Sequence, residues 1–252
     1  MIIHFLLPLY ARRVNCALKK EFVIYFSDQS PCCGAPVYRL KDGRIRCSHC
    51  RRRYGLKRLE REYRLMQCFC DDLSARRAAQ SAQTTYATAK KSYDRFRRLL
   101  LPYLEHCYTA HRDEVVEYDE YLYLDHSKRR DKRHIFDAHN FLTFDYGGKV
   151  YTILMPPLGR YKHAFLYDGL EDIYYEAFSR FLKIHRIARL RSLENTIVRF
   201  WRYFDEFMKK YKGIEADNFI YYLKEAEFKF NHPNPEREEV LRRLLYGSGA
   251  QT

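Results

Sequence analysis

The sequence has few acidic residues relative to basic ones, and it lacks a long apolar run. Its 252 residues include 46 Lys and Arg against 32 Asp and Glu, a formal net charge of +14. With 31% charged residues and a mean hydropathy of −0.58, the composition argues against membrane spans. The first apolar run ends at Pro8 and its basic residues follow it, an order that argues against a secretory signal. The charge predicts a polyanionic partner, the alternative being a merely soluble basic protein.

The eight cysteines lack the spacing of a secreted disulfide framework. Six of them are gathered between Cys32 and Cys70, and only Cys16 and Cys107 stand apart. We therefore expect a reducing, cytoplasmic compartment. The chain is long enough to bury a core, and we expect one main domain with smaller appendages after an N-terminal segment, 1–27.

Residues 28–55 have the pattern of a zinc ribbon. Two cysteine knuckles, one around Gly34 and one of the form Cys-x-x-Cys, flank a short hairpin that turns at Asp42-Gly43. Such knuckles build tetrahedral thiolate sites for structural Zn²⁺. Ser30 occupies the place of the first cysteine of the usual knuckle, and a metal-free hairpin with free thiols is the alternative. The expected ligands are Cys33, Cys47 and Cys50, with Cys32 or His49 as the fourth.

Residues 56–111 have helical periodicity, with an apolar stripe from Leu56 to Phe69. Ser74 is suited to cap a short Ala-rich helix over 75–80, and a turn at 81–83 precedes a basic helix. This order predicts a helix-turn-helix whose last helix suits the major groove. The alternative is a helical hairpin with solvated charges. The expected DNA-binding residues are Arg76, Arg77, Thr84, Lys90, Lys91 and Arg95.

From about residue 112 the pattern changes to strands. We expect three, over 115–124, 134–146 and 149–155, the last two joined by a turn at Gly147-Gly148. The basic stretch 128–133 in the first connection is expected to be available for phosphates. The later elements expected are a short strand over 164–167, a helix over 170–184, a short strand over 187–190, helices over 194–211 and 217–230, and a flexible tail over 233–252.

An acidic pair, Asp119-Glu120, lies in the middle of the first of these strands. A buried carboxylate is costly unless it is paired or binds a metal, and Mg²⁺ lets carboxylates approach a phosphate. An acid in mid-strand, followed by further strands and helices, is the order of an RNase-H-like domain, a mixed α/β fold, here over 112–232. Such sites gather distant carboxylates around two ions. The candidates are Asp119, then Asp168 with Asp172 as the fallback, then Glu194 or Asn195.

Several short motifs occur in a fixed order along residues 28–232. They are Arg44-Ile45-Arg46-Cys47-x-x-Cys50, Glu117-x-Asp119-Glu120, Gly148-Lys149-Val150-Tyr151, Asn195-Thr196-Ile197-x-x-Phe200-Trp201, Lys210-Tyr211-x-Gly213-Ile214 and Tyr222-Leu223-Lys224-Glu225-x-Glu227-Phe228-x-Phe230-Asn231. In this series the chain resembles bacterial insertion-sequence transposases that join a zinc ribbon, a helix-turn-helix and an RNase-H-like domain with an Asp-Asp-Asn or Asp-Asp-Glu triad plus a lysine.

The resemblance implies a bacterial, nucleoid-associated enzyme that binds double-stranded DNA at transposon ends and works as a homodimer or larger assembly. It also implies Mg²⁺ or Mn²⁺ at Asp119 and Asp168, with Asn195 completing the triad. Two positions depart from the family: Val198 stands where some relatives carry the third acid, and Asp205 stands where they carry the lysine. The alternatives are a catalytically reduced, transposase-derived DNA-binding regulator and a nuclease that cuts without joining.

Overall fold

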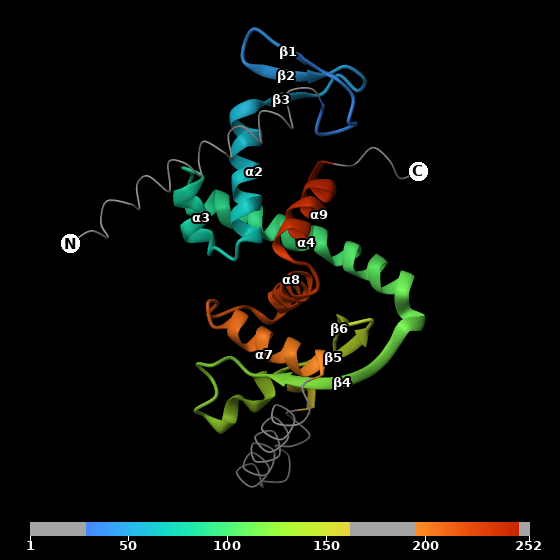
Figure 1. The fold of residues 1–252 in the computed structure, drawn as a ribbon. Coiled ribbons are helices and arrows are strands. Elements are labelled where there is room, and N and C mark those ends of the chain that lie inside the picture. Colours follow the sequence, from blue (N-terminus) through green and yellow to red (C-terminus); the bar gives the residue numbers. More distant parts are fainter. Residues whose placement is uncertain (1–28, 162–194, 247–252) are drawn as a thin grey trace, which may run out of the picture. The chain divides into compact units, whose positions relative to one another are not determined.

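The computed structural model describes residues 29–161 and 195–246, which fall into two compact units. The N-terminal unit contains the described residues 29–96 and 234–246, and the sheet unit contains 97–161 and 195–233. Within the described ranges the fold is mixed α/β, with six α-helices and two antiparallel sheets of three strands each (Figure 1). The expected α/β class is therefore confirmed at this level.

The N-terminal unit begins with a small sheet in the order β1-β2-β3. Its strands are β1 (Val37–Arg39), β2 (Arg44–Cys47) and β3 (Arg53–Gly55). The expected hairpin turn lies between the first two strands, where Gly43 has a φ of 76°. The last strand runs directly into helix α2 (Leu56–Cys70), as Figure 1 shows.

The three helices that follow the small sheet are α2, α3 (Ala75–Ser81) and the start of α4 (Tyr86–His111). The expected cap is present, since the Ser74 hydroxyl accepts a hydrogen bond from the backbone N–H of Arg77. The turn after α3 is a Schellman motif: Gln83 has a φ of 49° and the Thr84 N–H donates to the Ala79 carbonyl at 2.9 Å. The order short helix, turn and long helix is thus as expected.

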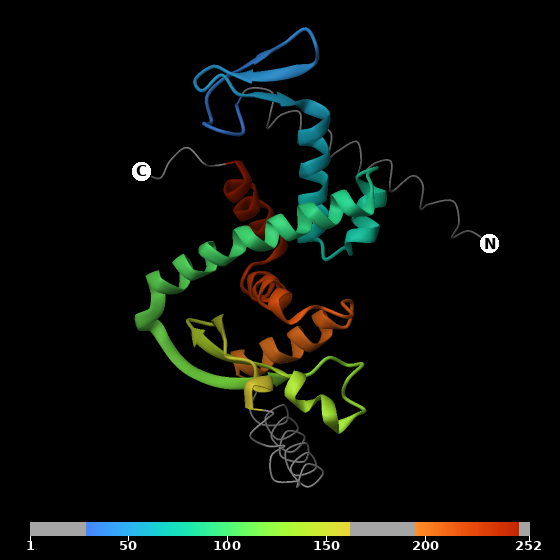
Figure 2. The same ribbon diagram turned by 180° about the vertical axis from the view of Figure 1, so that it is seen from behind.

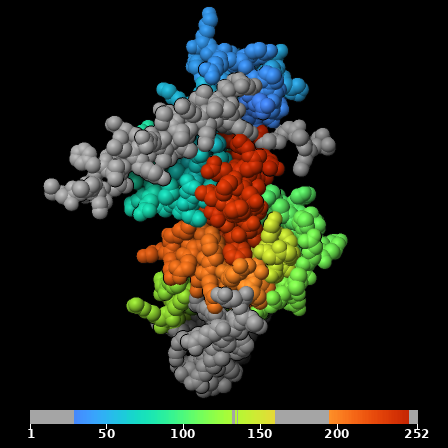
Figure 3. Space-filling view, in the orientation of Figure 1, coloured from blue at the N-terminus to red at the C-terminus, as the bar shows by residue number. Residues whose placement is uncertain are grey.

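Residues 234–246 correct the expected flexible tail, because they form helix α9 (Asn234–Tyr246). The helix buries Leu241 and Leu245, and it packs on α2 within the N-terminal unit (Figure 3). Arg237 donates to the Cys70 carbonyl at 3.0 Å, which also satisfies the end of α2. Residues 234–246 are rich in charged side chains and have few apolar positions, so the sequence pattern did not indicate this helix.

The sheet unit is built on β4 (Val115–Tyr123), β5 (His139–Tyr146) and β6 (Lys149–Leu154), which pair antiparallel in that order. Gly147 and Gly148 have φ of 59° and 81° and form the expected two-residue turn. The second strand is shorter than expected, because residues 132–137 form a 3-10 helix, η2 (Lys132–Asp137). Shorter 3-10 turns are η1 (Arg112–Glu114), η3 (Leu158–Tyr161) and η4 (Ala216–Asn218).

Helices α7 (Thr196–Met208) and α8 (Phe219–Asn231) cover one face of this sheet (Figure 2). The only tryptophan, Trp201, is fully buried and stacks on Tyr121 of β4 with ring centroids 4.9 Å apart. Its indole N–H donates to the Thr143 hydroxyl at 2.9 Å. Other members of this core are Tyr123, Phe141, Val150, Phe200, Phe204, Phe219 and Leu223.

Helix α8 also buries charged side chains, all of them paired. Glu225 accepts hydrogen bonds from Arg97 and from Lys229, each at 2.7 Å. Burial opposes its ionised form, but the two cations outweigh burial and lower the pKa of Glu225. Arg97, on the basic helix α4, is therefore a buried structural residue of the sheet unit.

Some expected elements lie outside the described residues. These are the N-terminal segment 1–27, the strand over 164–167, the helix over 170–184 and the strand over 187–190. Among the helices that the structure describes, none combines the length and apolar character needed to cross a membrane.

Candidate functional site

The two cysteine knuckles are tight turns of the N-terminal unit. In the first, the Gly34 N–H donates to the Ser30 carbonyl at 3.1 Å, and Gly34 has a φ of 64°. In the second, the Cys47 N–H donates to the Arg52 carbonyl at 2.9 Å, and Arg51 has a φ of 61°. These left-handed residues reverse the chain after each pair of cysteines, which turns both knuckles toward each other.

The four expected cysteine ligands come together at these knuckles. The sulfur atoms of Cys32, Cys33, Cys47 and Cys50 all lie within 4.8 Å of one another. Four thiolates around Zn²⁺ at about 2.3 Å would be spaced by roughly 3.8 Å, so the donor set fits a tetrahedral ion. The structure therefore selects Cys32 rather than His49 as the fourth member. Such a cluster could hold a metal ion, and its all-sulfur donor set suits structural zinc.

The surroundings of the thiols favour ionisation of some of them. The pKa of Cys47 is lowered to about 6, chiefly by the nearby Ser30 hydroxyl and by the backbone N–H groups of Cys50 and His49. The pKa of Cys33 is raised to about 12, first because of its hydrogen bond with Cys50. Sulfurs this close cannot all ionise without a cation between them, which is what a bound metal supplies.

Asp119 lies in the middle of β4, half-buried and paired in register with Thr143 of β5. Because side chains alternate along a strand, Asp119 shares its face with Tyr121 and Tyr123, the residues that pack beneath α7 and α8. Its carboxylate accepts a hydrogen bond from the Glu120 N–H at 2.7 Å. Glu120 itself is exposed on the opposite face. Of the acidic pair, only Asp119 faces the helices.

Asn195 caps helix α7, the long helix expected to carry the third catalytic residue. Its side-chain oxygen accepts from the Val198 N–H at 2.9 Å. Its amide nitrogen donates to both carboxylate oxygens of Glu117, at 2.9 and 2.8 Å. Glu117 lies two residues before Asp119, so the alternation of the strand puts both acids on the face that Asn195 approaches.

The structure therefore brings the first-strand acid and the helix asparagine to one region of the sheet unit. Sequence reasoning did not assign a role to Glu117, although the period-2 alternation from Asp119 would have placed it on the same face. Asp168, its fallback Asp172 and Glu194 lie outside the described residues. Within residues 29–161 and 195–246, the four cysteines form the only group of three or more His, Cys, Asp or Glu ligands that could share an ion.

The two positions that depart from the family motif have structural roles. Val198, in the first turn of α7, is buried in the core. Asp205, at the place of the expected lysine, accepts a hydrogen bond from Arg129 at 3.2 Å. These contacts give both residues a packing or pairing function, and neither supplies a cation near Asp119.

The residues expected to contact DNA lie on α3, on the turn after it and on the first half of α4. Arg76, Arg77, Lys90 and Lys91 are exposed, and Thr84 is half-buried in the turn. Arg95 is exposed as well but forms an ion pair with Glu62 of α2. Thr85 rather than Thr84 supplies the cap of α4, since its hydroxyl accepts from the Thr88 N–H at 3.2 Å.

No family model, curated protein or solved structure matches this chain. Its function therefore has to be inferred from its own residues. Two arrangements carry that inference: the four-cysteine cluster at the start of the N-terminal unit, and the approach of Asn195 to the acidic face of β4.

Proposed function

We propose that the chain is a DNA transposase, with an RNase-H-like catalytic domain that cuts transposon ends and joins them to target DNA. The observation that carries the proposal is the pair of hydrogen bonds between Asn195 and Glu117, at 2.9 and 2.8 Å. They hold the start of α7 against the face of β4 on which Asp119 lies. Two residues separated by 78 positions in the sequence thereby meet, as a shared catalytic site requires.

In this proposal Asp119 and Asp168 bind Mg²⁺ or Mn²⁺, and Asn195 or Glu194 completes the ligand shell. Ions held there would supply activation of the attacking hydroxyl and stabilisation of the leaving oxygen of a phosphodiester. Water attacks the phosphorus at the transposon end, and the break leaves a 5′-phosphate and a free 3′-hydroxyl. That hydroxyl attacks a target phosphodiester, forming one P–O bond and releasing a target 3′-hydroxyl. Glu117 holds the Asn195 amide in place for this site.

The N-terminal unit would supply recognition of the DNA ends. Exposed basic residues on α3 and α4, such as Arg76 and Lys90, are placed to contact phosphates or bases along a major groove. The zinc ribbon, with zinc on its four cysteines, would position that helical segment. Because two ends are cut and joined together, the active species would be at least a dimer.

The proposal is tested by separating cleavage from binding. Asp119→Asn removes a metal-binding charge without changing the size of the side chain, so end cleavage is expected to be abolished and end binding to persist. The matched control is Glu120→Gln, since this neighbour is exposed on the opposite face and both properties should remain. The substrate DNA for this assay would be the terminal inverted repeats that the proposal predicts on either side of the gene. Equal loss of cleavage and binding in Asp119→Asn would contradict the proposal.

A second candidate is a non-catalytic DNA-binding regulator descended from a transposase. It is favoured by Asp205, which stands where the family lysine is expected and pairs with Arg129 instead. A strand-transfer assay of the unmodified protein with Mn²⁺ decides between the two. Joined products support the transposase, binding without any cleavage supports the regulator, and nicked ends without insertion indicate a nuclease.

A further inference from the structure

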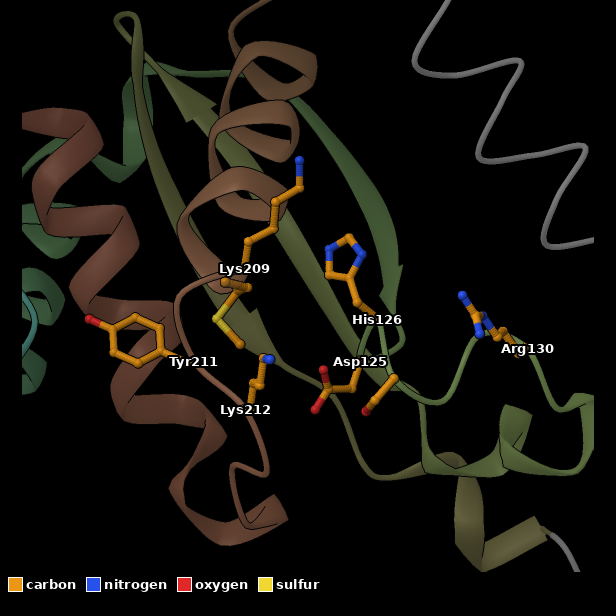
Figure 4. Close-up of a pocket in the computed structure, with 8 residues that line it drawn as sticks. Asp125, His126, Arg130, Lys209, Tyr211 and Lys212 are labelled. Atoms are coloured by element: carbon orange, nitrogen blue, oxygen red, sulfur yellow. The ribbon is translucent and has the colours of Figure 1, made fainter.

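The sheet unit has a pocket of about 380 Å³ where β4 and α7 both end (Figure 4). One wall comes from the chain after β4, and the other comes from the end of α7 and the turn that follows it. In Figure 4 Asp125 of the first wall and Lys212 of the second lie opposite each other, whereas the Tyr211 ring points away from the first wall. The lining residues are Asp125, His126, Ser127 and Arg130 on the first wall, and Met208, Lys209, Tyr211 and Lys212 on the second.

The charges of this pocket favour an anion. Arg130, Lys209 and Lys212 contribute three cations, against one carboxylate in the lining, that of Asp125. Lys209 also forms an ion pair with Glu206, which offsets part of its charge. His126 and Ser127 add groups that can donate hydrogen bonds. The three cations are exposed, so an anion can reach them directly from the solvent.

Both walls are held in place by contacts outside the pocket. In the basic stretch 128–133, Lys128 pairs with Asp137 at 2.9 Å, and Arg129 donates to the Leu124 carbonyl at 2.7 Å. These two cations are therefore engaged with the protein, which corrects the expectation that the whole stretch is available for phosphates. On the opposite wall the Tyr211 hydroxyl donates to the buried Glu225 at 3.3 Å. The pocket is thus formed before a ligand arrives.

We infer that this pocket binds a backbone phosphate of duplex DNA, away from the reacting phosphodiester. The inference rests on the proposed function, because it extends the DNA path from the Asp119 face to the other end of α7. Helix α7 has 13 residues and begins at Asn195, which contacts Glu117, so its two ends are about 20 Å apart. That distance corresponds to about six base pairs along a duplex.

The test measures how DNA affinity depends on salt, using a 30-base-pair duplex of arbitrary sequence. Each phosphate contact contributes about −0.9 to the slope of log K against log salt concentration. Arg130→Gln and Lys212→Gln should each reduce the magnitude of this slope, and the double variant should reduce it by about 0.9 in total, because the pocket binds one phosphate. Arg130→Lys keeps the charge and should keep the slope. The matched control is Lys149→Gln, an exposed cation at the start of β6, which should leave the slope unchanged.

A wild-type slope in the double variant would overturn the inference, and so would an equal reduction in Lys149→Gln. Far-UV circular dichroism of each variant checks that the exposed substitutions leave the fold intact. Failure of the proposed function gives a different result: Asp119→Asn would then leave end cleavage unchanged or remove binding as well. The salt slopes of the pocket variants are measured without any cleavage, so the two failures can be told apart.

Discussion

The two antiparallel sheets of this protein have the same number of strands and are stabilised in different ways. Within β1–β3 the strands are three or four residues long, and only Ile45 and Cys47 are buried. The strands β4–β6 are six to nine residues long and bury aromatic and aliphatic side chains beneath α7 and α8. A sheet with so little buried area needs another source of stability, and the clustered cysteines can supply it through a metal.

The largest expected effect comes from removing one sulfur from the small sheet. Cys47→Ser should abolish zinc binding and unfold residues 30–55, because structural zinc contributes about 10–16 kcal/mol in comparable small domains. Zinc content and amide hydrogen exchange measure the two results, and β4–β6 should keep its protection. Cys107→Ser, a half-buried cysteine outside the cluster, is the control. If Cys47→Ser kept its full zinc content and β2 stayed protected from hydrogen exchange, the small sheet would not depend on the four cysteines for its stability.

The corresponding change in the larger sheet removes its central aromatic contact. Trp201→Ala should lower the free energy of unfolding by about 3–5 kcal/mol, because the side chain is fully buried and its loss leaves a cavity. The Thr143 hydroxyl would also lose its partner. Urea denaturation followed by circular dichroism measures the effect, and zinc content should not change. Arg199→Ala, an exposed site on the same helix, should cost less than about 0.5 kcal/mol.

Acid should weaken the larger sheet through His139. Burial is the main cause that lowers the pKa of His139 to about 4, and its ring stacks on Phe219 at 3.8 Å. The unfolded chain, with a pKa near 6.5, binds the proton first, so stability present above pH 6.5 is lost as the pH falls toward 4. The loss should approach about 3 kcal/mol. His139→Phe should flatten the pH dependence of unfolding in this window; an unchanged slope would exclude His139 as its source.

The smallest expected effects come from substitutions in the hairpin turns of the two sheets. Gly43 and Gly148 have φ of 76° and 81°, and an added Cβ would meet no atom within 4 Å at either position. Substitution by Ala should therefore cost only backbone strain, about 1–2 kcal/mol. In Gly148→Ala the cost should appear as reduced unfolding free energy. In Gly43→Ala it should appear as about 5- to 30-fold weaker zinc binding, because folding of the ribbon and binding are one equilibrium.

The elements that could be predicted from sequence are those with local signals. Ser74 begins α3, Gly147 and Gly148 define the β5–β6 turn, and the cysteine spacing indicates the cluster of four sulfurs. Other outcomes depend on tertiary contacts that no local pattern carries. Helix α9 is stabilised by packing on α2. Arg97 can be buried because it pairs with Glu225, a residue 128 positions later in the sequence.

The candidate site was predictable only in part for the same reason. The alternation of β4 places Asp119 on a definite face, and the cap position of Asn195 follows from the start of an amphipathic helix. That these two segments meet through Glu117 depends on how α7 packs against the sheet. The choice of Cys32 over His49 likewise depends on the geometry of two turns rather than on spacing.

The single tryptophan makes intrinsic fluorescence a probe of one of the two units only. Indole emission arises from Trp201 alone, and its position against Tyr121 confines that signal to the sheet unit. Unfolding of β1–β3, with any metal held by the four cysteines, should therefore leave the emission spectrum almost unchanged, while unfolding of the core beneath α7 should shift it to longer wavelength. One fluorescence titration and one metal assay would thus follow the two units separately in the intact protein.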